Sequence, residues 1–140
     1  MMRPLALSLA ALAAAACGTG DTTTPTGPTT VTLTTETFAG SLAVGGSRFY
    51  SFSVSSGGTV RVTLASVTSP ADGTALGHAL EIGLGTPAGT GCATSVVGQA
   101  APALVAQLLS SSQPGVRCVR VSDVGELTGP VNFAVRFTHP

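Results

Sequence analysis

The chain has 140 residues, no formal net charge at pH 7 and only 9% charged residues. It contains no Lys, and its six Arg residues are spread from Arg3 to Arg136. Nucleic-acid binding requires clustered basic side chains that neutralise phosphates, so the composition argues against a nucleic-acid partner. The length suits one domain, and the 18 Gly and 9 Pro, together with many Ser and Thr, favour turns and strands over helices.

The first sixteen residues have the features of a signal peptide. Arg3 supplies one positive charge, and residues 5–16 form an apolar run that is shorter than the roughly 20 residues a permanent membrane helix needs. The run ends Ala-Ala-Ala-Cys17, which resembles the bacterial lipobox, where small residues precede a lipid-modified Cys. We expect residues 1–16 to be cleaved and Cys17 to carry lipid. The alternative is an ordinary secretory signal peptide that leaves Cys17 as a free thiol.

The predicted anchor also predicts a location. Several acyl chains on one residue hold a protein firmly on a membrane, whereas a single chain binds only marginally. Position +2 is Gly18 rather than the Asp that favours inner-membrane retention in the enteric sorting scheme, so we expect export to the cell envelope and attachment to the outer membrane. Residues 17–30 contain no large apolar side chain and predict a disordered linker between anchor and domain.

Residues 31–140 show the period-two alternation of half-buried strands. The clearest strands are expected at residues 50–54, 59–64 and 131–137, where apolar side chains alternate with Ser, Thr, Asn or Arg. Further strands are expected at residues 30–38, 79–84, 103–108 and 117–121, and residues 100–109 suit either a strand or a short helix. Seven or eight short strands separated by Gly- and Pro-containing turns predict an all-β fold, an antiparallel β-sandwich.

Two cysteines remain for the domain. Export places Cys92 and Cys118 in an oxidising compartment, where a disulfide is the default state. Such a bond would stabilise the fold by about 3–4 kcal/mol in the chain-entropy model. A zinc site is not expected, because the chain has no CxxC motif and only two His residues, His78 and His139.

Three stretches of the domain carry a family resemblance: FAGSL at residues 38–42, GGSRFYSFSV at 45–54 and GGTVRVTL at 57–64. They resemble the bacterial pre-peptidase C-terminal domain, with its small-residue opening strand, Y-x-F-x-V strand, Gly-Gly turn and T-V-x-V-x-L strand. The closing segments CVRV and FAV resemble the last strands of that family. The resemblance covers residues 31–140 and implies a jelly-roll-like sandwich. It implies no calcium site, because the acid-rich positions of calcium-binding relatives are matched here only by Glu36 and Glu81.

Candidate chemical sites are few. Asp123 and Glu126, in the turn SDVGE, are weak candidates for calcium, and an Asx-type turn is the favoured interpretation. No G-x-S-x-G motif occurs, and a catalytic triad needs a positioned His with an acid. We interpret His78 and His139 as surface or structural residues, with His139 mobile near the end of the sequence. Four arginines, Arg48, Arg61, Arg120 and Arg136, are expected to point outward as a polar face, or to line one sheet face and contact acidic glycans.

The sequence therefore predicts a non-enzymatic, lipid-anchored module of the cell envelope without a cofactor. Its expected partners are the membrane, through Cys17, and a polysaccharide or an envelope protein. A strong lectin is disfavoured because the chain has no Trp and its single Tyr, Tyr50, is expected to point inward. The alternative is a purely structural or assembly role without a small ligand, and a hydrolase is a remote third.

Overall fold

The computed structural model describes residue 27 and residues 30–140. The predicted signal peptide, Cys17 and most of the predicted linker lie outside the described residues. Within the described part of the chain, no helix has the length and apolar character needed to cross a membrane.

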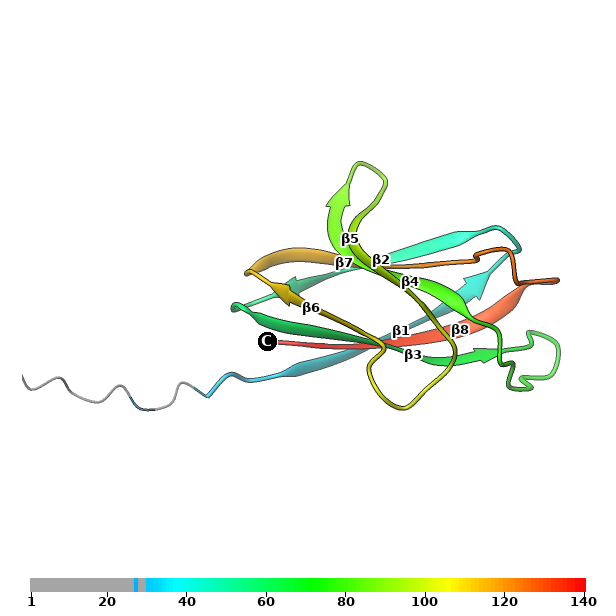
Figure 1. Ribbon diagram of the computed structural model, residues 1–140, viewed down its shortest axis with the longest axis horizontal. Coiled ribbons are helices and arrows are strands. Elements are labelled where there is room, and N and C mark those ends of the chain that lie inside the picture. Colours follow the sequence, from blue (N-terminus) through cyan, green and yellow to red (C-terminus); the bar gives the residue numbers. More distant parts are fainter. Residues whose placement is uncertain (1–26, 28–29) are drawn as a thin grey trace, which may run out of the picture.

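Residues 30–140 form eight strands in two antiparallel sheets that pack face to face (Figure 1). The strands are β1 (Thr34–Leu42), β2 (Ser47–Val54), β3 (Gly58–Thr68), β4 (Leu80–Ala88), β5 (Gly91–Ala100), β6 (Leu108–Ser112), β7 (Gly115–Ser122) and β8 (Val131–His139). Sheet A has the order β1-β8-β3-β6, and sheet B has the order β2-β7-β4-β5. Each sheet interleaves early and late strands, as eight-stranded jelly rolls do. The predicted jelly-roll-like antiparallel sandwich is confirmed.

The strands differ from the prediction most clearly at the opening strand and at β5, and several others extend beyond the predicted residues. The opening strand covers Thr34–Leu42 instead of residues 30–38, because β1 pairs with β8 from Thr34 opposite His139 to Leu42 opposite Val131. Strand β5 was not predicted, since its sequence, GCATSVVGQA, is rich in small residues and lies at a sheet edge. These differences arise because pairing with a neighbour, which the single segment does not reveal, decides where a strand begins.

Residues 101–107 correct the prediction for the segment 100–109. This stretch is neither a strand nor a helix: β5 ends at Ala100, β6 begins at Leu108, and an irregular loop joins them. The loop is fixed to the edge of β3 by hydrogen bonds from the backbone N–H of Ala103 to the carbonyl of Leu64 and from that of Gln107 to Val62. The backbone N–H groups of this loop therefore bond to the edge of β3 instead of forming the internal hydrogen bonds of a helix.

The alternating apolar residues fill a single core between the sheets. Val60, Val62 and Leu64 of β3 are fully buried, as the alternation predicts. The Phe137 ring on β8 packs with its centre 4.4 Å from that of Phe52. The residues between these inward positions point to the outer face of each sheet.

The β4–β5 hairpin bends over the outer face of sheet B (Figure 1). Cys92 on β5 and Cys118 on β7 form the predicted disulfide, with their Cα atoms 5.9 Å apart. Since β4 lies between these strands, a flat sheet would separate them by about 9.6 Å, twice the usual strand spacing. The bend follows a register shift at Gly85, where a Cβ atom would lie 1.9 Å from the carbonyl oxygen of Ala93, so only Gly permits this approach.

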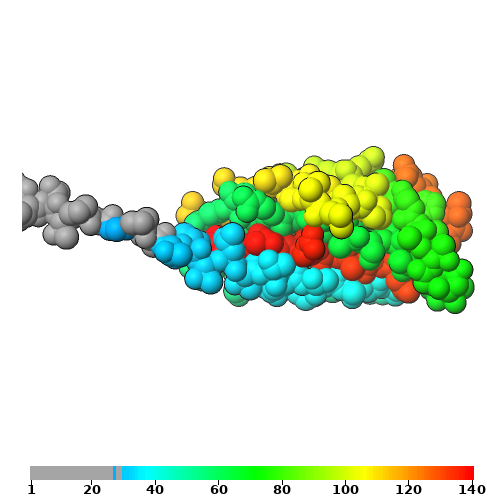
Figure 2. Space-filling view, turned by 90° about the horizontal axis from the view of Figure 1, so that it is seen from below, coloured from blue at the N-terminus to red at the C-terminus, as the bar shows by residue number. Residues whose placement is uncertain are grey.

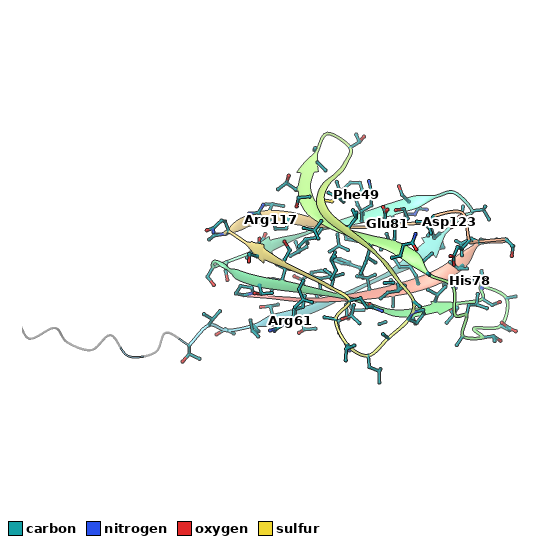
Figure 3. All side chains as sticks on the ribbon, viewed as in Figure 1. Phe49, Arg61, His78, Glu81, Arg117 and Asp123 are labelled. Carbon is teal, nitrogen blue, oxygen red and sulfur yellow. A yellow bond between two sulfur atoms is a disulfide. The ribbon has the colours of Figure 1, made fainter. Side chains whose placement is uncertain are left out.

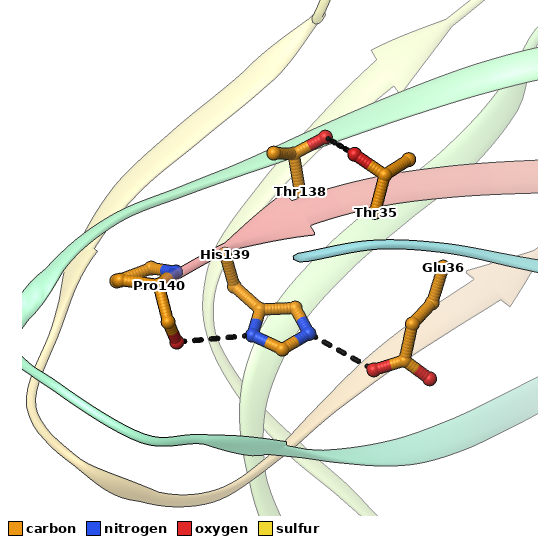
Figure 4. A network of polar contacts seen from close by, with 5 residues as sticks. All are labelled: Thr35, Glu36, Thr138, His139 and Pro140. Atoms are coloured by element: carbon orange, nitrogen blue, oxygen red, sulfur yellow. Dashed lines mark hydrogen bonds and ion pairs between the residues drawn. The ribbon is translucent and has the colours of Figure 1, made fainter. Parts of the chain in front are cut away.

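The end of the sandwich at which β1 begins and β8 ends, which we call the entry end, contains a buried histidine. His139 is only 3% exposed, and its ring centre lies 5.0 Å from that of Phe52. Its Nε2 lies 2.9 Å from Oε1 of Glu36, and its Nδ1 lies 3.2 Å from the carbonyl oxygen of Pro140 (Figure 4). The expectation of a mobile His139 is therefore wrong, because the pairing of β1 with β8 extends to this residue and turns its ring inward.

Candidate functional site

The Asp123 turn is held together by backbone donors. Oδ1 of Asp123 accepts hydrogen bonds from the N–H groups of Gly125, Glu126 and Leu127 at 2.8, 3.0 and 3.2 Å, and Oδ2 accepts one from Gly45 at 2.8 Å. The Gly45 N–H, followed by those of Gly125, Leu127 and Glu126, lowers the pKa of Asp123 from its ordinary value of 3.8 against the opposing effect of burial. Both oxygens thus face N–H donors in an Asx-type turn, and Glu126 supplies a backbone donor, so the contacts are those of a structural carboxylate.

Replacement of Asp123 by Asn is expected to lower the melting temperature at neutral pH by a few degrees, because the side-chain amide would meet the Gly45 N–H with a donor. Because the pKa of Asp123 is lower in the folded protein than its unfolded value of 3.8, its carboxylate stabilises the fold at pH values above 3.8. This stabilisation is lost as the pH falls through the pKa of the folded state. The two proteins should therefore converge at acidic pH in thermal melts followed by circular dichroism. Glu126→Gln, which keeps the backbone donor of an exposed residue, is the matched control and should melt like the wild type. A constant difference at every pH would contradict this role.

The four arginines do not line one sheet face, which was the alternative to an ordinary outward polar face. Arg61 on β3 and Arg136 on β8 lie on the outer face of sheet A, whereas Arg120 on β7 lies on the outer face of sheet B. Arg48 on β2 donates from Nε to the carbonyl oxygen of Ser41 at 3.2 Å. The alternation gave the outward side correctly for Arg61, Arg120 and Arg136. It was wrong for Arg48, which lies on the same side of β2 as Tyr50 and Phe52, near the exposed start of the strand. The alternation also does not reveal to which sheet each strand belongs.

The outer face of sheet B carries an ion pair beside an exposed aromatic ring. An Nη atom of Arg120 lies 2.7 Å from Oε1 of Glu81, and the Ser122 hydroxyl donates to the same oxygen at 3.1 Å. Phe49, opposite Arg120 across the β2–β7 ladder, is 39% exposed. Figure 3 places Phe49 and Glu81 over this sheet. Tyr50, by contrast, points inward as expected and stacks on Phe38 with ring centres 4.4 Å apart.

The outer side of sheet A carries an apolar patch formed by Leu104, Val105 and Leu109. Leu104 is 89% exposed and Val105 72% exposed, the two highest values among the exposed large apolar residues of the described chain. Their loop, yellow in Figures 1 and 2, protrudes from the outer side of sheet A, which is the lower layer in Figure 1. Leu109 pairs with Arg61, and Arg136 donates to the carbonyl oxygen of Leu104 at 3.0 Å. The patch is thus apolar, held in place and bordered by two cations.

A pocket of about 170 Å³ lies at the entry end between β4, β5, β6 and β7, and β4 contributes Leu84 and Gly85 to its lining. It is lined by the Arg117 side chain, by Ser95, Ser110 and Ser112, and by Gln113. Sequence analysis placed Arg117 in a strand but assigned it no role. The sequence did contain a sign of this: Arg117 lies two and four residues before the buried Val119 and Val121, so its side chain points to the same inward side of β7.

The two histidines lie at opposite ends of the domain. His78 borders a shallow pocket of about 240 Å³ with Leu76, Pro70 and Pro130, and Figure 3 places it away from the entry end, where His139 is buried. Within residue 27 and residues 30–140, no group of three or more His, Cys, Asp or Glu side chains is arranged to hold a metal ion.

Neither a family model nor a curated protein matches this chain. The resemblance to the pre-peptidase C-terminal domain therefore stays a prediction, and the functional argument rests on the surfaces described above.

Proposed function

We propose that this protein is a non-enzymatic module of the bacterial cell envelope, anchored through a lipidated Cys17, that binds an envelope protein through the apolar patch. The observation that carries the proposal is the exposure of Leu104 and Val105 on a loop that hydrogen bonds hold against β3. The β-sandwich and the family resemblance supply the scaffold.

The exposed loop has an energetic cost that a partner would relieve. Burial of a Leu or Val side chain contributes about 1.5–3 kcal/mol, so this pair offers a partner several kcal/mol. A mobile loop could turn such side chains inward, but Gln107 fixes this one by accepting the Leu64 N–H at 2.7 Å on its side-chain oxygen. An ordered apolar patch bordered by polar residues is typical of protein-interaction surfaces.

The charges around the patch define its partner more closely. Arg61 and Arg136 border it, and neither forms an ion pair with any residue in the described ranges. We therefore expect a partner surface that is apolar at its centre and acidic at its rim. Such a rim mainly accelerates association and excludes wrong partners.

The anchor is tested by replacing Cys17 with Ala. The wild type should fractionate with membranes and, by intact mass, lack residues 1–16 and carry lipid, whereas Cys17→Ala should be released completely into the soluble fraction because several acyl chains are lost. Residues 30–140 are unchanged in this variant, so their circular dichroism spectrum is the control for folding. Membrane association that persists in Cys17→Ala, or a mature mass equal to that of the whole chain, would refute the anchor.

The partner surface is tested by crosslinking in intact cells. The wild type should give a discrete adduct with another envelope protein, and Leu104→Ser/Val105→Ser should lose it. The control is Val44→Ser/Val97→Ser, which changes two apolar residues away from the patch that are each more than half exposed. The same adduct from both double variants, or none from the wild type, would remove the patch as the partner site.

A glycan ligand is the second candidate, and the outer face of sheet B favours it. The Phe49 ring offers a stacking surface, and Arg120 and Glu81 beside it offer polar contacts to hydroxyl groups. Thermal melts against a panel of polysaccharides test this candidate. A saturable shift that Phe49→Ala abolishes would establish glycan binding, whereas no shift across the panel would leave the protein partner.

A further inference from the structure

Arg117 lies at an inward-facing position of β7, where the neighbouring inward residues are apolar. It lies opposite Phe52 in the β2–β7 ladder, and both residues share the inward side with Val119. The strand therefore directs the guanidinium group into the space between the two sheets at the entry end, where Figure 3 places it. Arg117 is half-buried there, so part of its charge is withdrawn from water, and a bound anion would compensate that part.

The described residues compensate Arg117 only in part. One of its Nη atoms donates to the carbonyl oxygen of Gln113 at 3.0 Å, while Nε is buried and hydrogen-bonds to no described atom. Arg120 also has a buried unpaired Nε, but its charge is neutralised by Glu81. Within residues 30–140, no carboxylate forms an ion pair with Arg117. A guanidinium group has five N–H donors, so most of its capacity at this pocket is free.

The rest of the pocket adds donors and no acid. Besides Leu84 and Gly85, which have no polar side chain, its lining contains Gln113 and four Ser residues, whose amide and hydroxyl groups can donate hydrogen bonds, and no Asp or Glu. The hydroxyls of Ser95, Ser110 and Ser112 currently donate to backbone carbonyls at 3.1–3.3 Å, bonds long enough to be exchanged for an anionic acceptor. A volume of about 170 Å³ is close to that of cavities that accommodate a ligand of about six heavy atoms.

We propose that the Arg117 pocket binds a tetrahedral oxyanion of the phosphate type. The planar guanidinium fork matches two oxygens of such an anion, and the surrounding hydroxyls suit the remaining ones. The anion supplies the negative charge that Arg117 lacks among the described residues, and it would accept from the Nη groups of the guanidinium. Two sources share this chemistry: free phosphate and the headgroup phosphate of a lipid. A lipid is relevant because β1, the first strand after the proposed lipid anchor, begins at the entry end. The site does not depend on the proposed partner surface.

The Arg117 Nε–H resonance of the full-length, ¹⁵N-labelled protein provides the test. Titration with sodium phosphate at constant ionic strength should shift this resonance saturably, and sodium chloride should not. Arg117→Gln should weaken binding roughly tenfold or more, as expected for the loss of a charge-assisted pair, with the backbone amide resonances of the pocket as readout. The matched control, Arg61→Gln, removes an exposed Arg from sheet A and should bind phosphate like the wild type.

A second variant keeps the test decisive if Arg117→Gln fails to fold. Ser112→Ala retains the cation and removes one lining hydroxyl, so it should weaken phosphate binding a few-fold. A parallel titration with short-chain phosphatidylglycerol separates the sources: a shift with the lipid alone assigns a headgroup, and a shift with inorganic phosphate assigns a free anion. Absence of a saturable shift with either probe, or an equal shift with chloride, would overturn the proposal.

Discussion

Replacing Cys92 and Cys118 together by Ala is expected to lower the melting temperature of the protein by about 15 °C. The bond joins residues 26 positions apart, and the chain-entropy model assigns a loop of this length about 3.5 kcal/mol of stabilisation through the unfolded state. For a domain of this size, each kcal/mol corresponds to about 4–5 °C. Thermal unfolding followed by far-ultraviolet circular dichroism measures the difference.

The structure adds a second effect that loop length does not include. The disulfide holds the β4–β5 hairpin over sheet B, where Gly85 meets the backbone of Ala93. Without the bond, this hairpin is expected to lose protection against amide hydrogen exchange before the rest of the sheet. Cys17→Ala is the matched control, since Cys17 is not a partner in the bond, and it should melt like the wild type. An unchanged melting temperature for the double variant would show that the disulfide does not stabilise the fold.

The sequence was informative where a property repeats with every second residue. The alternation around Val60, Val62 and Leu64 assigned the buried side correctly because the side-chain period of a strand is fixed by its backbone. The disulfide was predictable from cysteine number and expected compartment, and Cys92 and Cys118 are indeed joined. Both arguments use local or compositional information alone.

Properties that depend on which strands are neighbours were not accessible. The sequence left open whether the outward arginines share one sheet face, and Arg61 and Arg120 belong to different sheets, because strand order is set by long-range pairing. The same reason hid the Arg117 pocket, whose lining comes from four strands, and β5, whose small residues follow β4 around a bend. The exposed state of Leu104 and Val105 was hidden because the loop around them bonds to β3, a segment about forty residues earlier in the chain.

Replacing Phe137 by Ala should be the most destabilising single core substitution that we consider, at about 3–5 kcal/mol. Phe137 is completely buried, and its ring contacts three other rings: Phe38 at 5.1 Å, Phe52 at 4.4 Å and His139 at 5.9 Å between centres. The neighbouring rings are held by the strands that carry them, so we expect the space left by Phe137 to close only in part and the cost to reach the upper part of that range. Urea unfolding followed by circular dichroism gives the free energy of unfolding.

Phe49→Ala is the matched control, because it removes the same side chain from the outer face of sheet B. Phe49 is already partly solvated, so its loss should cost no more than about 1 kcal/mol. The comparison separates burial between the sheets from aromatic character as such. Equal costs for the two variants would mean that the ring cluster around Phe137 contributes no more than a surface residue, and the placement of the core between sheets A and B would have to be abandoned. A large cost for Phe137→Ala alone would identify β8, which pairs with both β1 and β3, as the strand on which the stability of sheet A depends.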